Sequence, residues 1–277
     1  MNTLSSAANP RFKSLLKLAH SSRERKDRGL SLLDGIHLVA AYLEHIGRPE
    51  QVVVSKSGLD NPEIQVLLKA LAPLEPLVLN DALFKPLSTV ETPTGVIAAV
   101  KTPRPPAAPT EIVACVMLED IQDPGNLGSI LRSAAAAGIE HVCLSKNSVH
   151  SWSPRVLRAG MGAHFMLRIY EQCDLPPLAR SFQGRVIATS HRAKQTVFDA
   201  DLTGKVALVF GNEGGGLSDT LIEAADETVS IQMPGRTESL NVAAAAAVCL
   251  FERVRQQQSK APDGAYPTRA CRHIREK

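Results

Sequence analysis

The stretch 239-SLNVAAAAAVCLFERV-254 leads from a polar loop into a helix with five consecutive alanines. A second stretch, 124-PGNLGSILRSAAAAGIEHVCLS-145, repeats the arrangement, with a Pro-Gly-Asn turn before a helix that also carries an alanine run. Alanine is the best helix former and has almost no side chain, so it lets a helix lie close to its neighbours. Both helices are therefore expected to approach another element closely.

Around these stretches, short apolar runs alternate with segments that suit helices. The runs, in chain order, are VACVML, HVCLS, FMLRIY, RVIATS, KVALVF and VSIQM, and helices are expected over 127–137, 154–161, 176–182, 218–225 and 240–257. Apolar, β-branched runs of this length are typical of strands buried in a parallel sheet. The alternation predicts an α/β fold with a mainly parallel sheet.

A smaller α/β domain is expected upstream. Its helices are predicted over 10–21, 37–46 and 63–71 and its strands over LSLL, QVVVS, PLVLN and GVIAAV, with a basic loop after the first helix. The proline-rich stretch 101-KTPRPPAAPTE-111 favours an extended spacer, because proline cannot donate to a sheet. We expect domains over 1–104 and 113–257, a linker over 105–112 and a flexible basic tail over 258–277.

The composition narrows the class of protein. The chain of 277 residues contains no run of about 18 apolar residues, so no membrane span is expected. The five cysteines are scattered, without CxxC pairs, so we expect mostly buried reduced thiols, a cytoplasmic location and no metal. Residues 11–28 and 253–277 each carry seven Lys or Arg against two acids. These basic ends favour a phosphate-rich partner, and a solvated charged face is the alternative.

Three polar loops follow expected strands, and ligands of open α/β sheets bind beyond the carboxyl ends of strands. The loops are 119-EDIQDPGN-126, 211-GNEGGGLSD-219 and 233-MPGRTESLN-241. The second lacks the spacing of GxGxxG, and no GxxxxGK[ST] occurs, so neither a dinucleotide fingerprint nor a phosphate-binding loop is supported. Its glycines let the backbone approach a ligand closely, or they form a flexible turn.

The loops resemble the three signature motifs of the SpoU branch of the SPOUT methyltransferases, which transfer methyl from S-adenosylmethionine to a ribose 2′-hydroxyl of RNA. The matching segments are 123-DPGNLGSILRSAAAAG-138, 208-LVFGNEGGGLS-218 and 230-SIQMPGRTESLNVAAAAAVCLFE-252. Gln232 departs from the proline that this family commonly has there. The resemblance implies a deep trefoil knot, otherwise almost absent from proteins, and a homodimer formed through the knot domain.

The resemblance also implies the positions that hold the methyl donor, S-adenosylmethionine. These are Gly211, Ile231, Met233, Leu240 and Asn241. The apolar side chains of Ile231, Met233 and Leu240 are suited to flank adenine, and ordinary core packing applies to them as well.

The catalytic residues implied by the resemblance are Arg132, Asn126, Glu213, Ser239 and Asn241. Free arginine has a pKa above about 12, so Arg132 acts either as a base in a perturbed site or as a cation that stabilises the alkoxide and holds a phosphate. The alternative is that Arg132 is an ordinary surface residue of the helix. Asn126 holds a hydroxyl or orients Arg132, or caps a helix, and Ser239 is a second candidate cap. Glu213 is the expected partner of Arg132.

The first domain resembles, more weakly, the L30e-like substrate-binding domain often attached to these enzymes. Its matching segments are 9-NPRFKSLLKL-18, 33-LDGIHLV-39 and 92-TPTGVIAAV-100. The expected RNA contacts there are Arg11, Lys13, Arg23, Arg25, Lys26 and Arg28. The segment 153-SPRVLRAGMGAHF-165 adds Arg155 and Arg158, which lie three apart on one helical face and contact RNA phosphate or form a solvated face. His164 in the same segment is expected to be packed.

Together these features predict a homodimeric, S-adenosylmethionine-dependent RNA 2′-O-methyltransferase. Ribosomal RNA is preferred as substrate because of the two-domain layout, which is an argument by analogy. A transfer-RNA enzyme is the nearest alternative. An RNA-binding protein that has lost catalysis is disfavoured by the intact motif residues, and a nicotinamide-dependent oxidoreductase by the missing fingerprint.

Overall fold

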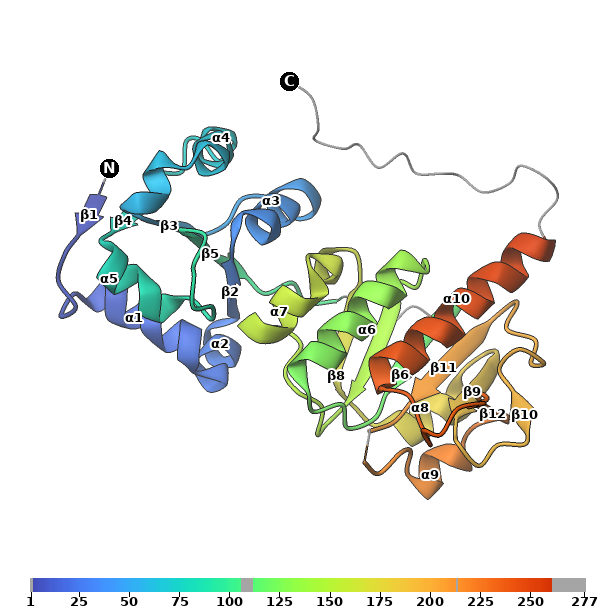
Figure 1. The fold of residues 1–277 in the computed structure, drawn as a ribbon. Coiled ribbons are helices and arrows are strands. Elements are labelled where there is room, and N and C mark those ends of the chain that lie inside the picture. Colours follow the sequence, from blue (N-terminus) through green and yellow to red (C-terminus); the bar gives the residue numbers. More distant parts are fainter. Residues whose placement is uncertain (1, 106–111, 213, 261–277) are drawn as a thin grey trace.

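Two β-sheets organise the chain, one in each half (Figure 1). The structure is a computed structural model that describes residues 2–105, 112–212 and 214–260. Most of the expected linker, all of the tail beyond Lys260, and Glu213 therefore lie outside the described residues. Both halves are α/β units, as predicted.

The sheet of the N-terminal half has five strands in the order β1-β4-β3-β5-β2. The strands are β1 (Asn2–Leu4), β2 (Leu30–Asp34), β3 (Gln51–Ser55), β4 (Leu77–Leu79) and β5 (Val96–Lys101). Strands β1, β4 and β3 run parallel, whereas β5 is antiparallel to both β3 and β2. The short strand β1 was not predicted.

Helices cover both faces of this sheet. They are α1 (Pro10–His20), α2 (Ser22–Arg28), α3 (Ile36–His45), α4 (Pro62–Ala70) and α5 (Asp81–Phe84), with 3-10 turns at η1 (Ser57–Asp60) and η2 (Lys85–Leu87). Apolar side chains of α1 and α5 form one core with the sheet, and those of α3 and α4 form another on the opposite face (Figure 1). Helix α1 begins where the Asn9 side chain accepts from the Arg11 N–H and Pro10 occupies the first turn.

The basic segment expected to be a loop is helix α2. The Ser21 side chain accepts a hydrogen bond from the Glu24 N–H and begins the helix. Gly29, with φ 61°, ends it in the left-handed conformation that glycine adopts at helix C-termini. The expectation of a loop was wrong because local capping outweighs the charge repulsion within a strongly basic segment.

The sheet of the C-terminal half has seven strands in the order β10-β12-β9-β11-β6-β7-β8, and every recorded pairing is parallel. The strands are β6 (Ala114–Leu118), β7 (His141–Ser145), β8 (Arg168–Cys173), β9 (Arg185–Thr189), β10 (Gln195–Thr196), β11 (Val206–Phe210) and β12 (Glu227–Ser230). The mainly parallel sheet is confirmed. Strand β12 is shorter than the predicted run, because the chain leaves the sheet before Ile231.

The helices of this half also form two layers. They are α6 (Pro124–Ala136), α7 (Pro154–Gly160), α8 (Leu175–Ser181), α9 (Asp219–Ile222) and α10 (Val242–Lys260), with η3 (Ala163–Phe165) after α7. Side chains of α6, α7 and α10 pack on one face of the sheet, and those of α8 and α9 pack on the other. Helix α10 extends to Lys260, beyond the predicted end of the last helix.

The close approach expected of the small-residue helices is confirmed. Ala134 of α6 and Ala246 of α10 are fully buried in one core, where the two helices lie side by side (Figure 1). Helix α6 also packs on α7 at Gly128, where an added Cβ would overlap that of Ala159 and lie 2.7 Å from the Val156 carbonyl oxygen. These contacts hold α6 between α7 and α10.

The two halves share a core. Trp152, Leu157 and Phe165 belong to the same buried cluster as residues of α3 in the N-terminal half. The ring of Tyr42 in α3 meets that of Phe165 edge-on, with centroids 5.4 Å apart. This apolar contact fixes the N-terminal half directly against the turn that follows α7.

Within the described residues the cysteines are free thiols, and three of them, Cys115, Cys143 and Cys249, are buried. Burial raises the pKa of Cys115 and of Cys249 to about 12, which keeps both thiols protonated at neutral pH. Within the described residues, no helix is both long and apolar enough to span a bilayer. The same residues contain no group of three or more His, Cys, Asp or Glu side chains placed to hold a metal ion.

Candidate active site

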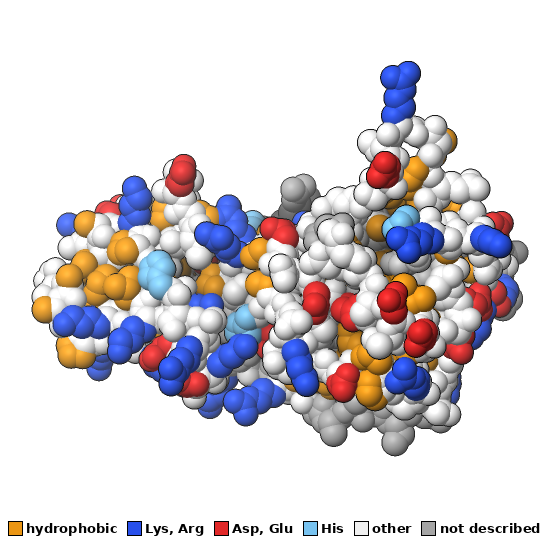
Figure 2. All heavy atoms as spheres, turned by 90° about the horizontal axis from the view of Figure 1, so that it is seen from below, with side chains coloured by type: hydrophobic (Ala, Val, Ile, Leu, Met, Phe, Trp, Pro, Cys, Tyr) orange, Lys and Arg blue, Asp and Glu red, His pale blue; other side chains and the backbone are white. Residues whose placement is uncertain are grey.

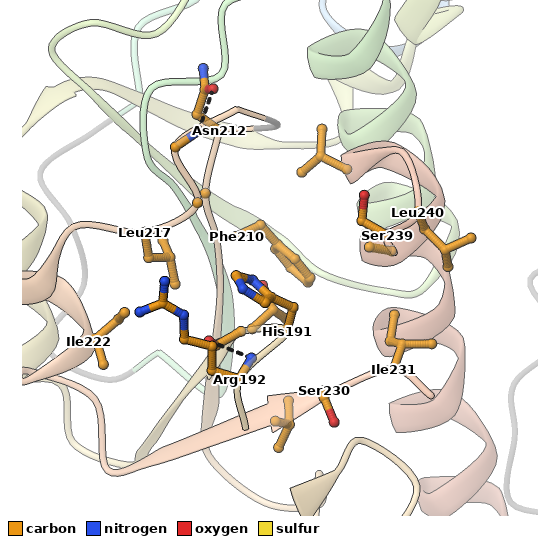
Figure 3. A pocket seen from close by; sticks show the side chains of 18 of the residues that line it. His191, Arg192, Phe210, Asn212, Leu217, Ile222, Ser230, Ile231, Ser239 and Leu240 are labelled. Carbon is orange, nitrogen blue, oxygen red and sulfur yellow. Dashed lines mark hydrogen bonds between the residues drawn. The ribbon is translucent and has the colours of Figure 1, made fainter. Parts of the chain in front are cut away.

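A cavity of about 570 Å³ opens beyond the carboxyl ends of β9, β11 and β12 (Figure 3). Its walls come from the segment after β9, the glycine loop after β11, and the irregular segment that joins β12 to α10. In Figure 3, Leu217 and Ile222 lie on the side opposite Ile231 and Leu240, with Phe210 between them. Two of the three predicted loops therefore build one pocket.

The glycine loop is held in shape by Asn212. Its side-chain amide donates to the Asp120 carbonyl oxygen at 2.8 Å, and its side-chain oxygen accepts from the Gly214 N–H at 2.8 Å. Backbone hydrogen bonds also join Asn212 and Gly216 in both directions. Gly211 has no space for a side chain, because an added Cβ would overlap the Gly216 backbone. The loop is thus a tight turn with its backbone at the cavity wall.

The segment from Ile231 to Asn241 forms the opposite wall without regular secondary structure. Ile231, Met233, Ser239 and Leu240 all line the cavity, as does Gly211. Leu240 leaves 40% of its surface exposed, although it is a large apolar side chain. Four of the five predicted donor-binding residues therefore meet in one pocket.

Asn241, the fifth, is not among the residues that line the cavity. Its side-chain oxygen accepts from the Ala243 N–H at 2.9 Å and caps α10, while its amide donates to the Asn126 side-chain oxygen at 2.9 Å. Asn241 therefore faces the first motif. Neither Asn126 nor Ser239 is a helix cap: Asp123 caps α6 by accepting from the Asn126 N–H at 2.8 Å.

Arg132 lies on α6 outside this cavity. Its side chain is exposed and lines a second cavity, of about 590 Å³, together with Arg155 and Arg158 of α7. The first motif thus contributes Asn126 to the contact with Asn241 and Arg132 to the second cavity. Glu213, the expected partner of Arg132, lies outside the described residues.

One wall of the first cavity was missed by the sequence analysis. Ser190, His191 and Arg192 follow β9 and line the pocket, and the Arg192 N–H donates to the Ser190 hydroxyl at 3.3 Å (Figure 3). The rule that ligands bind beyond strand ends applies to the run RVIATS as well, so the signal was present. The segment carries no glycine cluster and no motif that would have singled it out.

The basic surface predicted for RNA is largely exposed. Lys and Arg side chains form a band over α1 and α2 (Figure 2). Arg11, Lys13, Arg23, Lys26 and Arg28 are all exposed. Arg23 and Arg28 form ion pairs with acidic residues one helical turn away on α2, at 3.5 and 3.6 Å, which reduces the charge of this surface only partly.

Arg25 was predicted to belong to this exposed surface, and that prediction is wrong. It is only 5% exposed, and its guanidinium donates to the Leu18 and Ala19 carbonyl oxygens at 2.7 and 3.2 Å. Burial lowers the pKa of Arg25 from its ordinary value. Its N–H groups satisfy carbonyl groups at the C-terminus of α1, so Arg25 is a buried structural residue and not part of the exposed basic surface.

The first cavity fits a methyl donor of the S-adenosylmethionine type. Its volume lies in the range of small-molecule sites, roughly 300–1,000 Å³. Phe210, Ile231 and Leu240 supply apolar surface for an adenine ring, and Arg192 and Glu238 supply charges for the carboxylate and ammonium groups. The turn at Gly211, which a Cβ would block, allows backbone groups to approach the ligand closely.

Both halves match known protein families. Residues 114–251 match the SpoU rRNA Methylase family, and residues 9–98 match the MRM3-like substrate binding domain. A chain of Synechocystis described as an uncharacterized tRNA/rRNA methyltransferase is 37% identical over 95% of this chain and 97% of its own length. RlmB of Pseudomonas putida, a 23S rRNA (guanosine-2′-O-)-methyltransferase, is 31% identical over 83% and 98%. RlmP of Bacillus subtilis, a 23S rRNA (guanosine(2553)-2′-O)-methyltransferase, is 28% identical over 91% and 98%.

Solved structures of RNA methyltransferases have the same fold as this chain. A crystal structure of an RNA 2′-O ribose methyltransferase is 32% identical, with a TM-score of 0.82 over 92% of this chain and 99% of its own. The SpoU methyltransferase AviRb of Streptomyces viridochromogenes in complex with AdoMet is 26% identical, with a TM-score of 0.79 over 91% and 100%. The fold is thus that of a SPOUT methyltransferase. The chain belongs to the SpoU family of RNA methyltransferases.

Proposed function

We propose that this S-adenosylmethionine-dependent RNA 2′-O-methyltransferase acts on ribosomal RNA, as a homodimer, in the cytoplasm where ribosomal RNA is found. The relatives named as 23S rRNA enzymes support the substrate. The observation that carries the proposal is the cavity in which Gly211, Ile231, Met233 and Leu240 meet, with the Asn126–Asn241 hydrogen bond beside it.

We propose a division of labour between the two halves. Residues 1–104 bind RNA through the exposed side chains of α1 and α2, and residues 113–257 hold the donor and the reacting ribose. The donor supplies an electrophilic methyl group on a sulfonium, which needs little activation. The ribose hydroxyl is a weak acid, so its proton has to leave as the oxygen attacks.

Arg132 is proposed to act as a cation. A guanidinium gives up its proton only in a strongly perturbed site, and Arg132 is exposed on α6. An exposed, charged guanidinium is suited to hold the phosphate next to the target ribose and to stabilise the developing alkoxide. Asn126, Ser239 and Asn241 are proposed to position the hydroxyl, and Glu213 to orient Arg132.

The proposed dimer interface is the exposed face of α10. Ala244 and Phe251 are exposed seven residues apart on one face of this helix, and Phe251 leaves 49% of its surface exposed. A large aromatic side chain beside small alanines suits a close helix contact with a second copy. The trefoil knot implied by the family stays a prediction that accompanies this proposal.

Methylation of purified RNA with labelled donor tests the proposal. The wild-type protein should methylate ribosomal RNA from cells that lack it, and transfer RNA should remain unlabelled. The Arg132→Ala variant should lose transfer by at least about 100-fold while its donor affinity, measured by calorimetry, stays near wild type. Arg180→Ala, at an exposed site on α8, serves as the matched control. Unchanged turnover in Arg132→Ala, or labelling of transfer RNA alone, would contradict the proposal.

A further inference from the structure

The second cavity combines charge with an apolar side chain. Arg132, Arg155 and Arg158 line it together with Met161, and Thr89 contributes from the N-terminal half. All three arginines are exposed, and in the described part of the chain none of them has a hydrogen bond or ion pair through its guanidinium. The carboxylate of Asp123 also lines the cavity and is engaged in capping α6. The cavity is therefore basic, with cations open to a ligand.

Met161 adopts an unusual backbone conformation. Its φ of 49° and ψ of 38° place it in the left-handed region at the C-cap of α7. Glycine is the usual residue there, because a Cβ crowds the following carbonyl oxygen in this conformation. Glycines stand on both sides of this position, at 160 and 162. The left-handed C-cap position itself is occupied by Met161, whose long apolar side chain is 49% exposed.

The turn that carries Met161 is enclosed by packing. An added Cβ at Gly160 would lie 2.6 Å from the His164 ring, and one at Gly162, where φ is 90°, would lie 3.1 Å from the Ala41 Cβ of α3. Gly128 brings α6 against the same end of α7. Contacts with both halves thus hold the strained residue in place. Such strain persists where the surroundings over-determine it, and it is found mostly at functional sites.

A nucleotide has both chemistries that this cavity offers. Its phosphate suits open guanidinium groups, and its base has a flat π face that suits a polarisable thioether. RNA-binding proteins commonly read bases that have left the stack, and they combine apolar contact with basic side chains. We propose that Met161 contacts the base of an unstacked nucleotide of the substrate RNA whose phosphate is held by Arg155 and Arg158. This proposal rests on the proposed function and adds a base-contacting residue to it.

The decisive variant is Met161→Gly. It removes the side chain and relieves the left-handed strain at the same position, so the melting temperature should stay equal or rise. The KM for 23S rRNA transcribed in vitro should rise about three- to tenfold, with donor affinity unchanged, as expected for one thioether–aromatic contact. Met166→Ala, at another exposed methionine outside the cavity, should leave the KM unchanged.

Binding of short oligomers separates the base from the phosphate. Oligouridine of about 12 nucleotides, within the range of single-strand sites, is compared with an abasic ribose-phosphate oligomer of equal length. Met161→Gly should weaken binding of oligouridine only, whereas the double variant Arg155→Ala/Arg158→Ala should weaken binding of both. Equal KM and equal oligouridine affinity in Met161→Gly and wild type would overturn the inference. Methylation by the wild type tests the proposed function separately, so the two failures are distinguishable.

Discussion

The side-chain amide of Asn241 donates a hydrogen bond to the side-chain oxygen of Asn126 at 2.9 Å, across a sequence separation of 115 residues. The orientation of the Asn241 amide is set by its other contact, because its oxygen accepts from the Ala243 N–H and caps α10. The same side chain therefore begins a helix and ties the third motif to the first. This link places the start of α6 beside the loop that walls the donor cavity.

The two roles of Asn241 are separable by substitution. Asp at this position keeps the acceptor that caps α10 but loses the donor to Asn126, so Asn241→Asp should fold with near wild-type stability and lose most methyl transfer. Asn241→Ala loses both functions and should also lower the free energy of unfolding by about 1 kcal/mol. Urea denaturation and a methylation assay measure the two effects. Equal activity in Asn241→Asp and wild type would show that the bond to Asn126 has no role in the reaction.

Gly211 and Gly215 offer a matched pair in the glycine loop. An added methyl at Gly211 would overlap the Gly216 backbone, whereas one at Gly215 would have nothing within 4 Å. Gly211→Ala should therefore lower the free energy of unfolding by roughly 1–3 kcal/mol and abolish donor binding, because the turn has to open. Gly215→Ala should keep wild-type stability. Thermal denaturation and calorimetric titration with the donor would show the contrast, and equal stability of the two variants would refute it.

Phe251 tests the proposed homodimer. A charge at the centre of an apolar helix contact is costly, so Phe251→Asp should give a monomer. Val66 is also exposed, at 66%, but lies on α4 of the N-terminal half, and Val66→Asp should leave the oligomeric state unchanged. Light scattering coupled to size exclusion reports the mass directly. A dimer in Phe251→Asp would place the interface elsewhere.

Arg25 and Lys26 are adjacent cations whose substitution is expected to affect different properties, folding stability for Arg25 and RNA binding for Lys26. Arg25→Ala leaves two helix-terminal carbonyl groups without their donor and should cost about 1–3 kcal/mol of stability. Lys26→Ala should leave stability unchanged and, in combination with Arg23→Ala and Arg28→Ala, flatten the salt dependence of RNA binding. Urea denaturation and filter binding at several salt concentrations distinguish them. A stable Arg25→Ala protein with weakened RNA binding would reverse the assignment.

His164 makes folding sensitive to pH. Burial lowers the pKa of His164 to about 4, and its ring hydrogen-bonds to the Ser151 carbonyl oxygen at 2.9 Å. The unfolded chain takes up a proton near pH 6.5 while the folded one stays neutral, so stability is full above pH 6.5 and falls as the pH drops toward 4. His164→Gln should lose less stability than wild type over this window. Parallel pH profiles of the two proteins, from urea denaturation, would refute this assignment.

Much of the fold was accessible from local patterns. Most of the apolar runs predicted strands close to their observed bounds, although β8 and β12 are displaced by two or three residues from the runs FMLRIY and VSIQM. The Asn9–Pro10 pair marked the start of α1. The three motifs identified five of the residues that line the donor cavity, Ser239 among them. The analysis failed where a charged segment was taken for a loop, since α2 depends on capping at Ser21 and Gly29. It also failed at Arg25, whose burial depends on packing against α1.

The sequence by itself determined the α/β class, the order of the elements and the three motif loops, because each follows from apolar periodicity, turn chemistry and motif spacing within short segments. Only the tertiary structure decided which polar groups meet: Asn241 with Asn126, Arg132 with Arg155 and Arg158, and the wall at His191 with the loop at Gly211. These relationships bring together different segments of the chain, so helix packing and sheet order create them and no local pattern specifies them.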